Sequence, residues 1–182
     1  MTKTNEKIHV LADESLGGIK REYVEVNRKA KLGEKIVIVD ADPGYGDHYS
    51  NGDFFTVELY TGYGSGVATK CGHHVGNNEY CTLEPTNVVH IDGERYEMVE
   101  RAEVCEKVIH LNNDKSGGRV REVTNVGVGT IDVIEYEHPD GDITCGFSHG
   151  CYRVLVPLSK ENEYQEFEDK KRGYKEVKNF YT

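Results

Sequence analysis

Seven cysteine and histidine residues lie in two short stretches of the sequence, each compact enough to hold a metal ion. They are Cys71, His73, His74 and Cys81 in the first stretch, and Cys145, His149 and Cys151 in the second. Thiolates and imidazoles are the ligands that zinc prefers, usually four in a tetrahedron. Neither stretch contains a Cys-x2-Cys knuckle, and small thiols also suit the buried ends of strands. We therefore keep these residues as metal candidates and favour packing as the role of the cysteines.

A nucleophilic cysteine needs a base within reach, and Cys145 with His149 or Cys71 with His73 have a suitable spacing. A one-turn spacing is common by chance, however. The sequence has no Gly-x-Ser-x-Gly element and no phosphate loop that leads into a helix. We expect a non-catalytic protein that has no catalytic residue and requires no cofactor.

Tyrosine is unusually frequent in this chain, with twelve tyrosines and no tryptophan. A tyrosine ring offers a large contact face and a hydroxyl at small entropic cost, which suits contacts with proteins and with nucleobases. Glycine-containing loops at 43–52 and 61–66 carry several of the rings. The residues that we predict to be exposed contacts, or anion-binding neighbours of those contacts, are Tyr45, His48, Tyr49, Tyr63 and Arg95.

Composition limits the partners of the 182-residue chain. The 32 acidic and 22 basic residues give a formal charge of −10, and the basic residues do not cluster, so we expect no nucleic-acid binding. No apolar run approaches the roughly 18 residues that a membrane helix requires, and we expect no membrane association. Five cysteines without a recognisable signal segment favour reduced thiols and a cytoplasmic location.

An internal repeat organises the elements that must position these side chains. The stretches 24–85 and 104–157 each contain short alternating segments and end at a proline, Pro85 or Pro157. We align Gly33 with Gly118, because each precedes an alternating segment. Five short strands are stable when the sheet closes, since closure removes unpaired edges. The sequence therefore predicts an all-β protein with two tandem small barrels.

The domain boundaries follow from the same repeat. We expect residues 1–20 to be mostly disordered and residues 86–103 to form a bridging hairpin, in which Asp92-Gly93 supplies positive φ angles at the turn. The first barrel takes residues 21–85 and the second takes 104–158. Apolar residues at helical spacing in 159–182 predict a C-terminal amphipathic helix, with a disordered tail as the alternative.

A family resemblance agrees with the barrel prediction. The run Arg21–Val39, followed by Asn51-Gly52-Asp53 and by the strand Tyr80–Glu84, resembles small uncharacterised SH3-like barrel proteins of phages that infect Gram-positive bacteria. The resemblance implies SH3-like folds for both barrels. It carries over no catalytic residue, because such barrels host many unrelated functions.

The expected function is therefore that of a phage-type binding protein in the host cytoplasm, which contacts a host protein through the loops 43–52 and 61–66. One alternative is an anti-defence ligand sink that sequesters a nucleotide immune signal between aromatic loops, with Arg or Lys on its phosphates. A small zinc-binding protein is the third reading. The sequence leaves open whether the chain forms a homo-oligomer.

Overall fold

The fold is all-β over the residues that the computed structural model describes, which are 7–111, 118–137 and 141–158. The chain divides into two compact units. Unit 1 consists of Met1–Leu11 and Glu22–Thr86, and unit 2 consists of Ala12–Arg21 and Asn87–Thr182. The division after residue 86 lies one residue beyond Pro85, which ends the first predicted repeat. Within the described residues, no helix has the length and apolar composition to cross a membrane.

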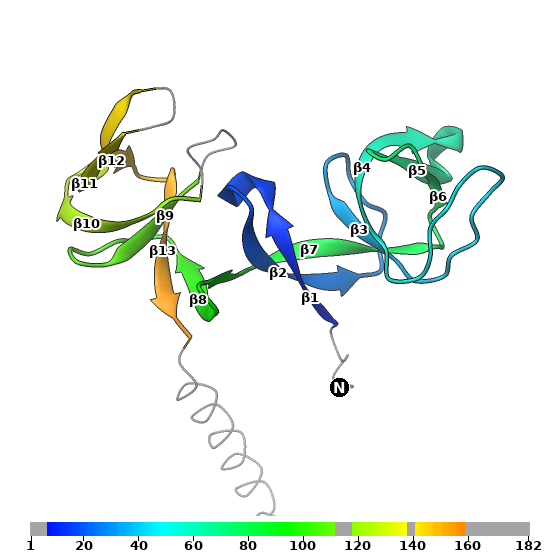
Figure 1. Ribbon diagram of the computed structural model, residues 1–182, viewed down its shortest axis with the longest axis horizontal. Coiled ribbons are helices and arrows are strands. Elements are labelled where there is room, and N and C mark those ends of the chain that lie inside the picture. The colour runs from blue at the N-terminus through cyan, green and yellow to red at the C-terminus, as the bar shows by residue number, and fades with distance from the viewer. Residues whose placement is uncertain (1–6, 112–117, 138–140, 159–182) are drawn as a thin grey trace, which may run out of the picture. The chain divides into compact units, whose positions relative to one another are not determined.

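Unit 1 is built on five antiparallel strands in the order β7-β3-β4-β5-β6, with β2 pairing with both β1 and β7 (Figure 1). Its elements are β1 (Ile8–Asp13), β2 (Ile19–Val26), β3 (Lys35–Ile38), β4 (Phe54–Thr61), the 3-10 turn η2 (Gly62–Gly64), β5 (Gly66–Thr69), β6 (His74–Gly76) and β7 (Tyr80–Ile91). The strands β1, β2 and β7 cross the division, so each contributes residues to both units.

The core of unit 1 follows the two-residue period of its strands. Ile36 and Ile38 on one face of β3 pack with Val57 and Tyr80, while Val37 on the other face packs with a second cluster around Leu83. Successive side chains of a strand point to opposite faces. The strand β3 is therefore buried on both sides, which explains its uninterrupted apolar sequence.

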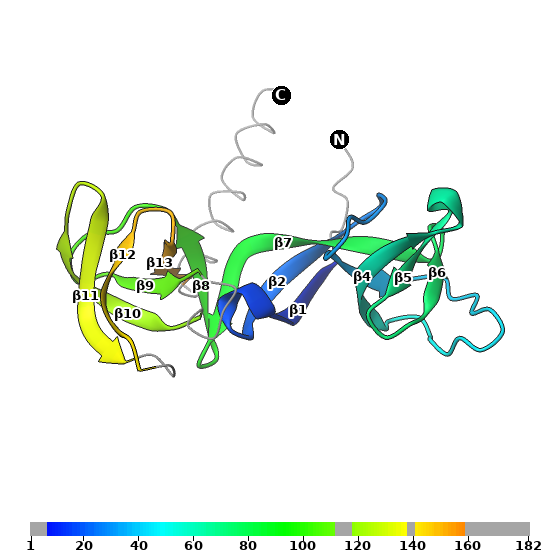
Figure 2. The same cartoon turned by 90° about the horizontal axis from the view of Figure 1, so that it is seen from above.

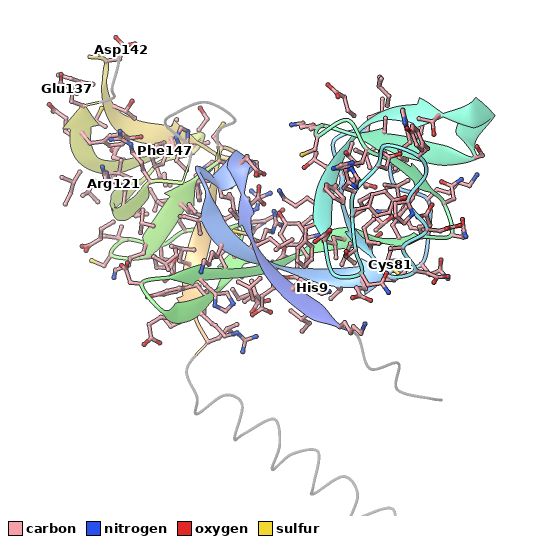
Figure 3. The ribbon with its side chains drawn as sticks, turned by 45° about the vertical axis from the view of Figure 1, so that its right-hand side comes forward. His9, Cys81, Arg121, Glu137, Asp142 and Phe147 are labelled. Atoms are coloured by element: carbon pink, nitrogen blue, oxygen red, sulfur yellow. The ribbon has the colours of Figure 1, made fainter. Side chains whose placement is uncertain are left out.

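Unit 2 has the ladder order β12-β11-β10-β9-β13-β8-β7. Its elements are the 3-10 turn η1 (Glu14–Leu16), β8 (Glu94–Val99), β9 (Lys107–His110), β10 (Val120–Val126), β11 (Thr130–Glu137), β12 (Ile143–Ser148) and β13 (Tyr152–Pro157). One core cluster contains Val108, Phe147 and Tyr152, and a second contains Leu16 and Met98. Figure 3 shows Arg121 and Phe147 together among these strands, where the Arg121 guanidinium lies 4.3 Å from the centroid of the Tyr136 ring.

The turns before β3 and β9 have the same hydrogen bonds. The Gly33 amide donates to Val57 O at 2.8 Å, and the Cys105 amide donates to Val123 O at 2.9 Å. In each turn a glutamate one residue further on accepts a bond from a backbone amide at 2.7 Å. Gly33 and Cys105 both have positive φ angles, 82° and 72°. The counterpart of Gly33 by hydrogen bonding is therefore Cys105, and the alignment of Gly33 with Gly118 was wrong.

The N-terminal prediction also requires correction. Residues 8–20 are not disordered, because they form β1, η1 and the start of β2. The short strand β1 lacks a clear alternating pattern but gains its hydrogen bonds from β2, and such tertiary pairing overrides weak local preference. The predicted C-terminal helix in 159–182 lies outside the described residues.

The hairpin expected at 86–103 is present, with β7 pairing with β8 around Asp92-Gly93. These two turn residues have φ angles of 52° and 85°, as an Asp-Gly hairpin turn requires. The hairpin belongs to unit 2 from residue 87 onward and extends that ladder through β13. It is therefore a part of unit 2 and not a separate bridge.

Candidate functional site

The loop between β3 and β4, residues 39–53, presents a fully exposed tyrosine on unit 1. Tyr45 is at the tip of a tight turn, in which the Asp47 amide donates to Gly44 O at 3.1 Å. Gly46, the third residue of this turn, has a φ angle of 93°. A positive φ angle at that position favours glycine. Figure 2 shows the loop, in cyan, reaching outward from the strands of unit 1. The turn therefore displays the Tyr45 ring to solvent.

A buried carboxylate holds the loop 39–53 by hydrogen bonds. Glu79, only 7% exposed, lies directly before β7. Its Oε2 accepts from the Asp42 amide at 2.8 Å and from the Tyr49 hydroxyl at 2.7 Å, and its Oε1 accepts from the Gly76 amide at 2.8 Å. A carboxylate with several donors makes strong charge-assisted hydrogen bonds. Both sides of the loop tip are therefore tied to one anchor.

Tyr49 is part of this anchor and not an exposed contact residue, so that prediction was wrong. Its side chain is 6% exposed and belongs to the core of unit 1. Its ring makes edge contacts with Phe55 and His73, at centroid distances of 6.3 and 5.9 Å. Burial and the hydrogen bond to Glu79 raise the pKa of the Tyr49 hydroxyl, so the phenol remains protonated and continues to donate.

Further polar side chains bond the loop to β6 and to its own backbone. Asp47 Oδ1 accepts from the His74 amide at 3.2 Å and lies 3.4 Å from His73 Nδ1. Asn51 Oδ1 accepts from the Ala41 amide at 2.7 Å, and Asp53 Oδ2 accepts from the Ser50 amide at 2.8 Å. A loop with this many local bonds loses little conformational entropy when it binds a partner.

The other predicted site residues lie in different surroundings. His48 is exposed on the same loop as Tyr45. Tyr63 is within η2, whose Gly64 carbonyl accepts a bond from the Asn77 side chain at 2.7 Å, but its own side chain lies outside the described part. Arg95 is on β8 of unit 2, paired with His90 across the hairpin. The structure therefore brings together Tyr45 and His48 on one loop.

The metal candidates do not assemble into a site in the described residues, where no group of three or more His, Cys, Asp or Glu side chains is placed to hold an ion. Cys71, Cys145 and Cys151 are exposed. Cys81 packs against the Leu83 cluster, and burial raises the pKa of its thiol. Figure 3 shows Cys81 among the strands of unit 1.

The candidate histidines have protein partners instead. His149 Nδ1 lies 2.8 Å from the Tyr152 hydroxyl, and His149 Nε2 lies 3.1 Å from Gly127 O. Both ring nitrogens of His149 are thus occupied by hydrogen bonds. His73 stacks edge-on against Phe55 at 5.3 Å, beneath the loop 39–53. His74 is an exposed residue of β6 and contributes its amide to Asp47.

Sequence reasoning missed the residues that support the site. Glu79 and Asp47 are single carboxylates in polar surroundings, and nothing in their spacing marks them as acceptors that hold the loop. The one local signal is Gly76-Asn77-Asn78-Glu79, in which a glutamate three residues after a glycine bonds back to the glycine amide. The arrangement is suited to holding an exposed ring rigidly and shows no nucleophile paired with a base.

Comparisons with known proteins give one informative relative. The chain is 67% identical over 46 residues to the uncharacterised protein YozW of Bacillus subtilis (strain 168), a match that covers 25% of this chain and 77% of the relative. No family model matches the sequence. No solved structure matches it either.

Proposed function

We propose that this chain, which belongs to the family of the uncharacterised Bacillus subtilis protein YozW, is a non-catalytic binding protein in a Gram-positive cell. It contacts a protein partner through the loop 39–53, with Tyr45 as the central contact. The observation that carries this proposal is a fully exposed tyrosine on a loop whose backbone is anchored by the buried Glu79. Tyrosine is enriched among the residues that dominate binding energy at protein interfaces.

The proposal includes the finer fold, two SH3-like barrels in tandem. In its support, each unit contains a set of five strands in the same relative order: the fifth strand of the set pairs with the first, and the remaining three follow in sequence. That order is β7-β3-β4-β5-β6 in unit 1 and β13-β9-β10-β11-β12 in unit 2. The matching turns at Gly33 and Cys105 support the same repeat. Loops of small barrels commonly carry the binding residues, because the strands hold them in place.

A phage origin and a partner from the host cell belong to this proposal as well. The relative from a Gram-positive bacterium is compatible with them. The alternative of a nucleotide sink between the aromatic loops needs cations beside those loops, and Lys29, whose Nζ donates to Gly64 O at 3.2 Å, lies at one of them. Its candidate cation, Arg95, is a residue of β8 in unit 2. The zinc-binding alternative has no group of ligands in the described residues.

The test compares the wild-type protein with Tyr45→Ala in affinity capture from a Bacillus subtilis lysate, quantified by mass spectrometry. Tyr60→Ala is the matched control, because Tyr60 is also more than half exposed but lies on the strand β4. We expect a specifically enriched protein whose recovery falls at least tenfold with Tyr45→Ala and is unchanged with Tyr60→Ala. Equal recovery with all three proteins, or no enriched protein, would overturn the proposal.

A further inference from the structure

Two arginines of unit 2 contact the same aromatic ring. Arg119 directly precedes β10, and Arg121 is the second residue of that strand. Their guanidinium carbons lie 5.2 and 4.3 Å from the centroid of the Tyr136 ring on β11, and Arg121 is labelled in Figure 3. Residues two apart on a strand share a face and are about 7 Å apart along the chain. One oxyanion can therefore accept hydrogen bonds from both guanidiniums.

The strands hold both arginines in place and leave most of their donors available. Arg121 lies in the β9–β10 ladder, and the Arg119 carbonyl accepts from the His110 amide at 3.1 Å. Arg121 Nη1 donates to Val120 O at 2.8 Å. Arg119 Nη1 donates to Glu137 O at 3.2 Å. A guanidinium has five N–H donors. Neither side chain makes a further hydrogen bond to a described residue, and both are partly exposed, so donors of both remain accessible to a ligand.

The charges of these arginines are not neutralised within the described part of unit 2. No carboxylate of the described residues forms an ion pair with Arg119 or Arg121, and Glu137 contributes its carbonyl oxygen. By contrast, Arg28 of unit 1 pairs with Glu34 at 2.8 Å. Two partly buried cations on one ring repel each other, and an anion bound to both offsets that repulsion.

Stacking on the ring prepares the arginines for a ligand. A guanidinium over an aromatic face is attracted by the negative charge of that face. Tyr136 is itself fixed in the core of unit 2 beside Phe147. The stacked side chains therefore lose less conformational entropy on binding than arginines that extend freely into solvent. Packing alone accounts for one arginine on the ring, whereas the second adds a repulsive charge.

We propose that Arg119 and Arg121 together bind a dianionic phosphate group, carried by a small monoester or present as free phosphate. Its oxygens and its charge of nearly −2 match two guanidiniums better than a carboxylate, with two oxygens and a single charge, does. Two arginines match one such group and fall short of the several phosphate contacts that hold a nucleic-acid backbone. The site lies in unit 2, and neither this proposal nor that of the Tyr45 loop depends on the other.

The test is a nuclear magnetic resonance titration of the full chain at constant ionic strength with glycerol 3-phosphate, inorganic phosphate and acetate. We expect saturable shifts of the Arg119 and Arg121 Nε–H signals with both phosphates, and dissociation constants at least tenfold lower than that of acetate. Tighter binding of glycerol 3-phosphate assigns the site to a monoester, and tighter binding of inorganic phosphate assigns it to free phosphate. Acetate that binds as tightly as both phosphates would overturn the proposal, as would the absence of saturable shifts with either phosphate.

The variants Arg119→Gln and Arg121→Gln each remove one guanidinium and should weaken phosphate binding at least tenfold. Arg121→Lys keeps the charge without the planar fork, so it should weaken binding at least threefold and less than Arg121→Gln does. The matched control is Arg101→Gln, which removes an exposed arginine of unit 2 between β8 and β9 and should leave the affinity within twofold of wild type.

Thermal melting establishes that each variant is folded before titration, and Arg121→Lys, the smaller change, replaces Arg121→Gln where the latter does not fold. Equal affinities of the wild type and the folded variants at positions 119 and 121 would overturn the proposal. So would an equal loss of affinity in Arg101→Gln.

Discussion

At the scale of single residues, the buried carboxylate of Glu79 decides whether Tyr45 is presented rigidly. Glu79→Gln keeps the shape of the side chain but removes its charge and one acceptor oxygen. Because Glu79 accepts three hydrogen bonds at 2.7–2.8 Å, we expect the free energy of unfolding to fall by about 1.5–3 kcal/mol. Urea denaturation measures this change.

The matched control for that variant is Glu58→Gln on the exposed face of β4, which should change stability by less than about 0.5 kcal/mol. Amide hydrogen exchange in residues 40–50 should also accelerate in Glu79→Gln and not in the control. Equal stabilities of the two variants would show that Glu79 does not anchor the loop.

Asp13 gives unit 2 a sensitivity to acid. Burial raises the pKa of Asp13, but the hydrogen bonds from Ser15 and Arg21 outweigh burial and leave that pKa below its ordinary value of 3.8. A lowered pKa in the folded state stabilises the protein above the pKa of the unfolded chain, and this stabilisation is lost as the pH falls through the folded value. We expect the free energy of unfolding to decrease below about pH 4.

Asp13→Asn tests this linkage. The variant should be less stable than the wild type at pH 7, and the difference between the two proteins should shrink as the pH falls below about 4. Chemical denaturation at a series of pH values measures both curves. A difference that is constant from pH 7 to pH 2.5 would contradict the assigned role of Asp13.

At the level of elements, substitutions in the turns before β3 and β9 should change the free energy of unfolding in opposite directions. Cys105 has a φ angle of 72°, which costs a residue with a Cβ about 1 kcal/mol. Cys105→Gly should therefore raise the free energy of unfolding by about 1 kcal/mol. Gly33→Ala should lower it by a similar amount, although a Cβ at Gly33 meets nothing within 4 Å. Thermal denaturation compares the two variants.

The control for these turns is Cys145→Gly, since Cys145 lies within the strand β12. Glycine in a strand interior costs backbone entropy, so this variant should lose stability. A loss of stability in Cys105→Gly as well would mean that its backbone conformation is not the one described.

The same elements show how far the sequence could predict this fold. The alternation of apolar and polar residues was sufficient to predict the β class. The Asp92-Gly93 pair was sufficient to predict the hairpin between β7 and β8. The similarity of the turns before β3 and β9 was not predictable, because the residue that has the positive φ angle of Gly33 in the second turn is Cys105, and a cysteine carries no turn signal. Tyr49 was misplaced for a similar reason: the sequence of a loop does not show which of its side chains turns inward to a buried acceptor such as Glu79.

For the whole molecule, the formal charge of −10 predicts that the chain does not bind nucleic acids. A phosphate backbone is repelled by a surface with excess carboxylates. We expect no retardation of a DNA duplex or of single-stranded RNA in a mobility-shift assay at low salt. Retardation that weakens with added salt would reveal a basic surface that contradicts this account.

The proposed function requires that Tyr45, displayed by the anchored loop 39–53, touches the protein partner. The most direct measurement places a photo-crosslinking phenylalanine analogue at position 45 and, separately, at position 60, in protein expressed in Bacillus subtilis cells. We expect one discrete crosslinked protein from position 45 and none from position 60. Crosslinks of equal yield from both positions, or none from position 45, would contradict the proposed function.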